Sequence, residues 1–178
     1  MSLSTMPPSR FRGIGSEFFL SPTLLLPRRA PSVISGRDET PVWLNSGRAA
    51  LQWVWKSLVR THPGQLTCLL PGYLCPSVVQ PFREAGARID FYRVDEHLQV
   101  DLDDLNSRLK PDVLAVLVIH YFGFFQPEAT LDLLGSVAPQ AFVIEDCTHS
   151  WLSRRDETRQ AGNRTIATIV SPRKFFLL

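Results

Sequence analysis

Polar side chains that could perform chemistry stand where predicted strands end or predicted helices begin. Asp146 and His149 follow the apolar run of residues 141–144, with Glu145 directly before Asp146. Open α/β sheets bind their ligands just beyond the carboxyl ends of the strands. A carboxylate there can hold the ring nitrogen of a bound cofactor in its protonated form, and an imidazole three residues on can bond another ring substituent. The alternative for Asp146 is a purely structural role at a strand end.

Lys174 is a second candidate for chemistry. It ends the turn Ser171-Pro172-Arg173-Lys174, which follows another apolar run. A lysine forms a Schiff base readily when burial or a neighbouring cation lowers its pKa, and Arg173 is such a neighbour. Most lysines are solvated surface charges, which is the alternative here.

Two further groups lie at comparable positions. The segment Ser46-Gly47-Arg48 lies at the N-terminus of a helical pattern, where free main-chain N–H groups and the helix dipole favour an anion. Arg48 could add its charge to such a site, and the alternative is a plain N-cap followed by a surface arginine. His120 directly follows the most apolar strand, where its ring either contacts a ligand or caps the strand end.

A hydrolase or metal site would need a different combination of residues. The candidates for it are Cys147, His149, His120 and Asp146. Cys147 and His149 are only two residues apart, which strains a nucleophile–base pair because adjacent residues beyond a strand point in different directions. Metal ligation at such a spacing remains an alternative.

The elements that must position these side chains follow from the apolar periodicity. Spacings of three and four residues indicate helices, whereas short apolar runs and alternation indicate strands. We expect helices over residues 48–61, 77–85, 101–110 and 127–138, and strands over residues 66–70, 88–94, 113–119, 141–145 and 165–170. This alternation predicts βαβ units in a three-layer α/β domain with a mainly parallel sheet. Residues 1–40 are expected to form an extended arm, and residues 151–164 a polar surface excursion.

Composition excludes several classes of protein. With 178 residues, 44% of them hydrophobic, the chain suits one globular domain with a real core. The net charge of +2 is spread along the sequence and does not predict a nucleic-acid interface. The longest apolar run, residues 113–119, is too short to cross a bilayer. Three cysteines without a CxxC pair indicate a cytoplasmic protein, although the acid-free first sixteen residues leave an organelle transit peptide open.

The order of these groups resembles the pyridoxal 5'-phosphate (PLP)-dependent aminotransferases of fold type I, and most closely the DegT/DnrJ/EryC1/StrS family of sugar aminotransferases. The resemblance covers about residues 43–176. Residues 45–51 (NSGRAAL) resemble the family's phosphate-binding GT-x-AL segment, and residues 70–76 (LPGYLCP) resemble the turn that carries the ring-stacking residue. The other matching segments are residues 91–95 with Asp101 (F-x-D-V-D … D), residues 120–123 (H-x-Y-G), residues 145–150 (E-D-A-A-Q-A) and Ser171 to Lys174, where the Schiff-base lysine is expected.

The resemblance implies a large α/β/α PLP-binding domain and amino transfer to a keto sugar, such as a sugar nucleotide, or to a related carbonyl substrate. Asp146 would pair with the pyridinium nitrogen, His149 would approach the phenolic oxygen, and Lys174 would form the Schiff base and move the proton. An amino donor and a keto acceptor are the expected small-molecule substrates, and a homodimer is the expected assembly. The expected cofactor-binding residues are Ser46, Gly47, Arg48, Tyr73, Cys75, His120, Asp146, His149, Ser171 and Lys174.

Several features depart from the family pattern. Arg48 replaces a threonine, His149 replaces a glutamine, and Cys75 stands where many members have an aromatic residue, for which Tyr73 could substitute. The sequence stops four residues after Lys174, whereas family members continue into further strands and a small C-terminal domain. We therefore expect residues 41–178 to be a partial PLP-binding domain, a fragment that needs its missing half or a partner that supplies it. The alternative is a catalytically inactive relic or interaction protein with the same fold.

Overall fold

A parallel β-sheet forms the centre of the molecule. The structure, a computed structural model, describes residues 42–137, 141–150 and 165–174. Their strands pair in the order β2-β1-β3-β4-β5, and every pair of neighbours is parallel. The strands are β1 (Thr67–Pro71), β2 (Arg88–Tyr92), β3 (Val113–Ile119), β4 (Phe142–Asp146) and β5 (Thr165–Ile169). Since the strands are parallel, their carboxyl ends share one edge of the sheet.

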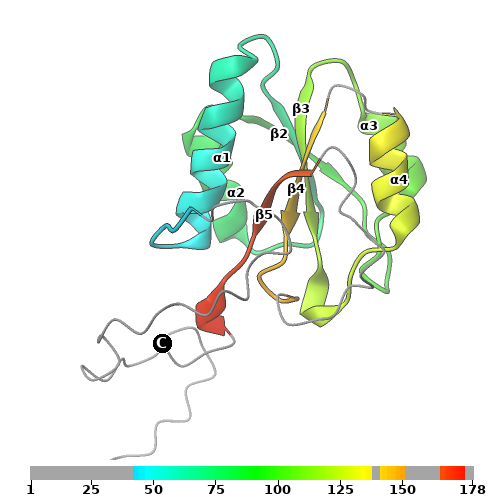
Figure 1. Ribbon diagram of the computed structural model, residues 1–178. Helices are drawn as coiled ribbons and strands as arrows, with labels where there is room; N and C mark the ends of the chain where they lie inside the picture. The colour runs from blue at the N-terminus through cyan, green and yellow to red at the C-terminus, as the bar shows by residue number, and fades with distance from the viewer. Residues whose placement is uncertain (1–41, 138–140, 151–164, 175–178) are drawn as a thin grey trace, which may run out of the picture.

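Helices cover both faces of this sheet, which confirms the predicted three-layer α/β architecture. Figure 1 shows α1 and α2 on one face and α3 and α4 on the other. The helices are α1 (Gly47–Thr61), α2 (Pro76–Glu84), α3 (Leu102–Arg108) and α4 (Glu128–Val137), with short 3₁₀ turns η2 (Tyr121–Gly123) and η3 (Pro172–Lys174). Among the described residues, none of the helices has the length and apolar character that a membrane crossing requires.

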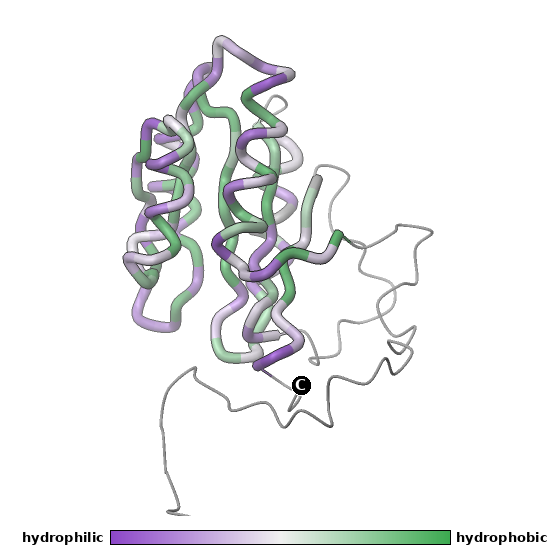
Figure 2. Tube along the Cα trace, turned by 90° about the vertical axis from the view of Figure 1, so that its left-hand side faces the viewer, coloured by the Kyte–Doolittle hydropathy of each residue, from purple (hydrophilic) through white to green (hydrophobic). Residues whose placement is uncertain are grey.

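The two faces of the sheet carry separate apolar cores because side chains alternate along each strand. Leu117 and Ile144 pack toward α1 and α2, where Trp55 meets Phe82 edge to face at a centroid distance of 5.9 Å. Val116, Val118 and Val143 pack on the opposite face with residues of α3 and α4. Hydrophobic residues accordingly follow the strands through the interior in Figure 2, while the helices carry hydrophilic stretches. This alternation decides which polar residues at the strand ends can meet.

Helix α1 begins where the sequence predicts an N-cap. The hydroxyl of Ser46 accepts a hydrogen bond from the main-chain N–H of Ala49 at 3.2 Å, so Ser46 is the capping residue. The helix ends at Thr61, and His62 is its C-cap.

The predicted boundaries differ from the structure mainly between β2 and α3. β2 ends at Tyr92, two residues early, and Val94 instead forms an isolated antiparallel bridge with Val100. The intervening loop is organised by Asp95, whose carboxylate accepts main-chain hydrogen bonds from His97 and Gln99. Local carboxylate–backbone bonds of this kind compete with strand pairing, and alternation alone does not reveal them. The predicted N-terminal arm and polar excursion lie outside the described residues.

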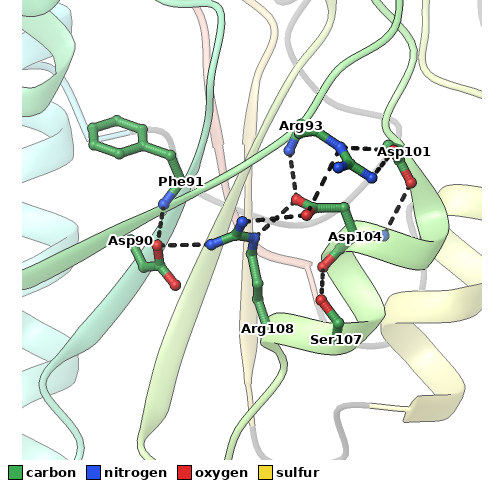
Figure 3. Close-up of polar contacts among 7 residues, drawn as sticks. All are labelled: Asp90, Phe91, Arg93, Asp101, Asp104, Ser107 and Arg108. Carbon is green, nitrogen blue, oxygen red and sulfur yellow. Dashed lines mark hydrogen bonds and ion pairs between the residues drawn. The ribbon is translucent and has the colours of Figure 1, made fainter.

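Two arginines and three aspartates fasten α3 to β2 (Figure 3). Arg108 bonds Asp104 at 2.8 Å and Asp90 at 2.9 Å, while the main-chain N–H of Arg93 donates to Asp104 at 2.8 Å. The guanidinium group of Arg93 also bonds Asp101, which is the N-cap of α3. Asp104 is only 8% exposed, so its several donors compensate for the loss of water around its charge.

Candidate active site

Glu145 and Asp146 end β4, and they point to opposite faces of the sheet. Asp146 shares the face of Ile144, toward α1 and α2, whereas Glu145 shares the face of Val143, toward α3 and α4. Both side chains are buried, at 6% and 1% exposure. The two adjacent carboxylates therefore belong to different environments, and only Asp146 lies on the side of the other predicted site residues.

Asp146, Thr148 and Lys174 are connected by hydrogen bonds at the carboxyl ends of β4 and β5. The main-chain N–H of Thr148 donates to Oδ1 of Asp146 at 2.9 Å. The side-chain amine of Lys174 donates to the hydroxyl of Thr148 at 3.4 Å. The turn η3 fixes the backbone of the lysine, because the main-chain N–H of Lys174 donates to the carbonyl of Ser171 at 3.0 Å. Thr148 was not among the predicted site residues, although a residue two positions after a strand-end aspartate is placed to bond its carboxylate.

The surroundings of Lys174 lower the pKa of its amine below that of an ordinary lysine. The residue as a whole is exposed, but partial desolvation of its amine is the largest cause, and the positive charge of Arg173 acts in the same direction. The negative charge of Asp146 opposes both. A lysine with a lowered pKa contains more of the neutral, nucleophilic amine near neutral pH. The environment therefore favours reaction with a carbonyl group.

His149 lies beside the same charges. Burial is the main cause that lowers the pKa of its imidazole, and the charge of Lys174 lowers it further, while Asp146 acts in the opposite direction. The ring stacks on Phe122, with centroids 5.6 Å apart and planes inclined by 6°. Nδ1 of His149 is buried and has no hydrogen-bond partner among the described residues. A buried ring nitrogen without a partner is a candidate ligand contact.

Phe122 is a second residue that sequence patterns did not single out. It has φ of 51° and ψ of 26°, a left-handed conformation that is uncommon for an aromatic residue, and its side chain is 62% exposed. Tyr121 beside it is fixed, because its hydroxyl donates to the carbonyl of Tyr73 at 2.6 Å. The sequence does not indicate a left-handed conformation at Phe122. The glycine that follows it, Gly123, is of the residue type that more often takes this conformation.

The turn before α2 and the start of α1 lie near Lys174. The thiol of Cys75 is 3.1 Å from the hydroxyl of Ser77. Its pKa is lowered, chiefly by hydrogen bonds from Ser77 and further by the positive charges of Arg48 and Lys174. Tyr73 is 54% exposed, with its ring 5.8 Å from that of Tyr121. In Figure 1 the first turn of α1 and the red turn η3 lie at the same end of the sheet.

His120 is placed away from this cluster. Its side chain is fully buried, and both ring nitrogens contact the protein: Nε2 lies 2.8 Å from Glu145, and Nδ1 accepts from the main-chain N–H of Gln126 at 3.0 Å. The ring therefore lies on the α3 and α4 side with Glu145, across the sheet from Asp146. It reaches Asp146 only through its main-chain N–H, which donates to the carbonyl oxygen of Asp146 at 3.0 Å.

A buried cluster of His120, Glu145 and Cys147 has ligand atoms within 4.8 Å of one another, close enough to raise the question of a metal. The hydrogen bonds of His120 argue against one. Since a main-chain N–H is only a donor, Nδ1 of His120 must be the acceptor, and the proton of the neutral ring is on Nε2. A protonated Nε2 facing Glu145 cannot bind a metal or accept a proton from a thiol. This geometry disfavours a metal bound at this cluster and a nucleophile pair of Cys147 with His120.

No protein family profile matches the sequence, and no curated protein matches it. Solved structures do match by fold. The sugar aminotransferase CalS13 from Micromonospora echinospora is 26% identical with a TM-score of 0.50, over 59% of this chain and 30% of that one. Alanine aminotransferase from Pyrococcus furiosus is 23% identical with a TM-score of 0.55, over 69% of this chain and 33% of that one. The chain thus spans about a third of the length of these neighbours.

A third neighbour contains the cofactor in its crystal. It is a GDP-4-keto-6-deoxymannose-3-dehydratase with a trapped PLP-glutamate geminal diamine, 19% identical with a TM-score of 0.55, over 66% of this chain and 31% of that one. Since the alanine aminotransferase and the dehydratase share only 23% and 19% identity with this chain, these two matches establish the fold alone. The described residues have the fold of the large domain of PLP-dependent transferases of fold type I, as the resemblance implied.

The functional groups of the candidate site are chemically suited to bind PLP. Asp146 offers a buried carboxylate for a ring nitrogen, and Lys174 offers an amine of lowered pKa for an aldehyde. The orphaned Nδ1 of His149 offers a contact for a further polar substituent. The first turn of α1 offers main-chain N–H groups that no helix can satisfy internally, and a side-chain carbon placed on Gly47 would meet no atom within 4 Å.

Proposed function

We propose that the chain is the PLP-binding part of an aminotransferase-like enzyme of the DegT/DnrJ/EryC1/StrS type, which transfers an amino group to a keto sugar or a related carbonyl substrate. The observation that carries the proposal is the Asp146–Thr148–Lys174 connection at the carboxyl edge of the sheet. The sugar aminotransferase neighbour and the shared fold support the choice of reaction class. Assembly as a homodimer, or with a chain that supplies a C-terminal domain, and a cytoplasmic location belong to the same proposal.

The proposed roles are those that the family resemblance implies, and the positions of the side chains support them. With PLP bound, Lys174 would supply the amine for its aldehyde group and would then hold and move a proton at Nζ. Asp146 would hold the proton on the pyridine nitrogen, and His149 would bond the phenolic oxygen through Nδ1. When bound, PLP supplies the electron sink that amino transfer requires.

The phosphate group is assigned to the first turn of α1. Ser46 is already the N-cap of this helix, so its hydroxyl has a structural bond to Ala49. We therefore assign the phosphate contacts to the main-chain N–H groups of Gly47 and Arg48 and to the guanidinium group of Arg48. Cys75 and Tyr73 belong to the turn that faces the same space, with the ring of Tyr73 as the stacking surface and Ser171 as a further hydroxyl.

A titration of the purified full chain with PLP, followed by L-glutamate, tests the proposal. We expect a saturable visible absorption band from the chain and, once a C-terminal domain is supplied, the release of one equivalent of 2-oxoglutarate per bound cofactor. Lys174→Ala should abolish both, and Lys110→Ala, which changes an exposed lysine, should abolish neither. A band without 2-oxoglutarate even in the presence of the C-terminal domain would favour the alternative of a non-catalytic PLP-fold protein. Absence of a band in the wild-type chain, alone and with a C-terminal domain added, would contradict cofactor binding.

A further inference from the structure

His120 connects the ends of β3 and β4 by both its main chain and its side chain. Its main-chain N–H donates to the carbonyl oxygen of Asp146 at 3.0 Å, and its ring bonds the carboxylate of Glu145 at 2.8 Å. Glu145 and Asp146 project to opposite faces of the sheet. His120 therefore holds two consecutive residues of β4, one by its backbone and the other by its side chain.

The orientation of the His120 ring is fixed by Gln126. The main-chain N–H of Gln126 donates to Nδ1, which leaves the ring proton on Nε2, directed at Glu145. The side chain of Gln126 is itself held, because its amide donates to the carbonyl oxygens of Leu98 and Ile119 and accepts from the main-chain N–H of Val100. The network thus runs from the loop after β2 to the end of β4.

Because the network is buried, each of its polar groups needs a hydrogen-bond partner within the protein. His120, Glu145 and Gln126 are 0%, 1% and 7% exposed, so a donor or acceptor that lost its partner would not find water instead. Such networks are stable only when fully satisfied, which gives the ring a single allowed orientation. The rigid end of β4 is then available to support Asp146 and the Asp146–Thr148–Lys174 connection on the other face.

We propose that His120 is a positioning residue for Asp146, acting from the opposite face of the sheet through its Nε2–H bond to Glu145 and its main-chain bond to Asp146. The inference rests on the proposed function only in taking Asp146 as the carboxylate of the site. It assigns the ring of His120 no contact with the cofactor or the substrate. Its tests use the chain without cofactor, so they can fail independently of PLP binding.

The tautomer of His120 is the first test. The chain has four histidines, so long-range ¹H–¹⁵N spectra of ¹⁵N-histidine-labelled protein can be assigned by single substitutions. We expect the His120 ring to carry its proton on Nε2, with Nδ1 unprotonated. A proton on Nδ1 would overturn the proposal, whatever the behaviour of the variants.

Two substitutions separate the two bonds of the ring. His120→Gln places an amide N–H near the position of Nε2 and keeps the bond to Glu145, whereas His120→Asn places an oxygen near the position of Nδ1 and keeps only the bond from Gln126. The readout is the pKa of Lys174, measured by NMR after reductive ¹³C-methylation of the three lysines. Lys174 faces Asp146, Arg173, Cys75 and His149, and the charge of Asp146 is a major factor that raises its pKa.

We expect His120→Asn to lower the pKa of Lys174, because Asp146 is no longer held beside it, and His120→Gln to restore the wild-type value. Tyr92→Phe is the matched control, since it removes a buried hydrogen bond of the same sheet, from the tyrosine hydroxyl to the carbonyl of Leu117 at 2.7 Å. It should destabilise the chain without moving the pKa. An unchanged pKa in folded His120→Asn, or an equal shift in Tyr92→Phe, would show that the network is merely structural.

Discussion

The amine of Lys174 lies 3.4 Å from the hydroxyl of Thr148, whose main-chain N–H donates to the carboxylate of Asp146. One residue thus links a lysine after β5 to an aspartate at the end of β4. Lys174 and Asp146 thus lie in one site, and the described contacts join them through Thr148 rather than by a direct ion pair. It also accounts for the position of the lysine, which the turn η3 alone would leave free to rotate.

Thr148→Val is expected to lower the pKa of Lys174, because the hydroxyl accepts a hydrogen bond that favours the protonated amine. Thr148→Ser retains the acceptor and should leave the pKa near its wild-type value. ¹³C-methyl NMR of the lysines across pH measures both. A pKa that is the same in all three proteins would mean that the contact does not form in solution.

Phe122→Leu is expected to raise the pKa of His149. Burial is the largest cause of the lowered pKa of this imidazole, and the stacked ring of Phe122 supplies part of that burial. Phe124→Leu, which changes a side chain that is 79% exposed, is the matched control and should have no effect. Histidine NMR titration measures the shift, and a pKa unaffected by Phe122→Leu would argue against the stacking.

Cys75 is expected to react with iodoacetamide before Cys68 and Cys147, because it is exposed and its pKa is lowered, whereas the others are buried. Ser77→Ala should reduce its rate at neutral pH by roughly a few-fold, since the hydrogen bonds from Ser77 are the main cause of the lowered pKa. Ser57→Ala, which changes a hydroxyl on α1, is the control. Equal rates in Ser77→Ala and wild type would contradict this cause.

The network of Figure 3 is expected to make the fold sensitive to acid. Hydrogen bonds from Arg108 are the largest cause that lowers the pKa of Asp104 in the folded chain. A carboxyl group with a depressed folded-state pKa stabilises the fold above its unfolded pKa of about 4, and this stability is lost as the pH falls through the folded pKa. Stability should therefore fall steeply below about pH 4.

Asp104→Asn tests this linkage by urea unfolding at neutral pH and at about pH 3. It should cost about 1–3 kcal/mol at neutral pH, because Arg93 and Arg108 lose one of the two acceptor oxygens and the negative charge, and less at low pH. Asp103→Asn, at an exposed position in the same helix turn, should change little at either pH. An equal loss of stability at both pH values would rule out the proposed linkage.

Much of the fold follows from the sequence because apolar periodicity is a strong local signal. The run of residues 113–119 matches β3 at both ends, and Ser46 caps α1 as its position predicts. The predictions are weaker where local polar bonds decide the backbone, as at Asp95, which turns the expected end of a strand into a loop.

The site could be predicted only in part. The strand-end aspartate and the lysine after the next strand are recognisable by type and order, and the structure brings them together. The separation of Glu145 from Asp146 follows from strand alternation, but the engagement of Nδ1 of His120 depends on Gln126, six residues away through an irregular turn. The spacing from Asp146 places Thr148 near its carboxylate, but the contact of Thr148 with Lys174 and the left-handed backbone of Phe122 depend on the tertiary structure.

Borohydride trapping of PLP on the purified chain, followed by peptide mass spectrometry, tests the central proposal most directly. The sequence contains three lysines, Lys56, Lys110 and Lys174, so the labelled position is easily assigned. We predict that at low PLP concentrations the reduced adduct forms on Lys174, and that Asp146→Asn weakens this labelling. Labelling spread over all three lysines in proportion to their exposure, or its absence from Lys174, would contradict the proposed site.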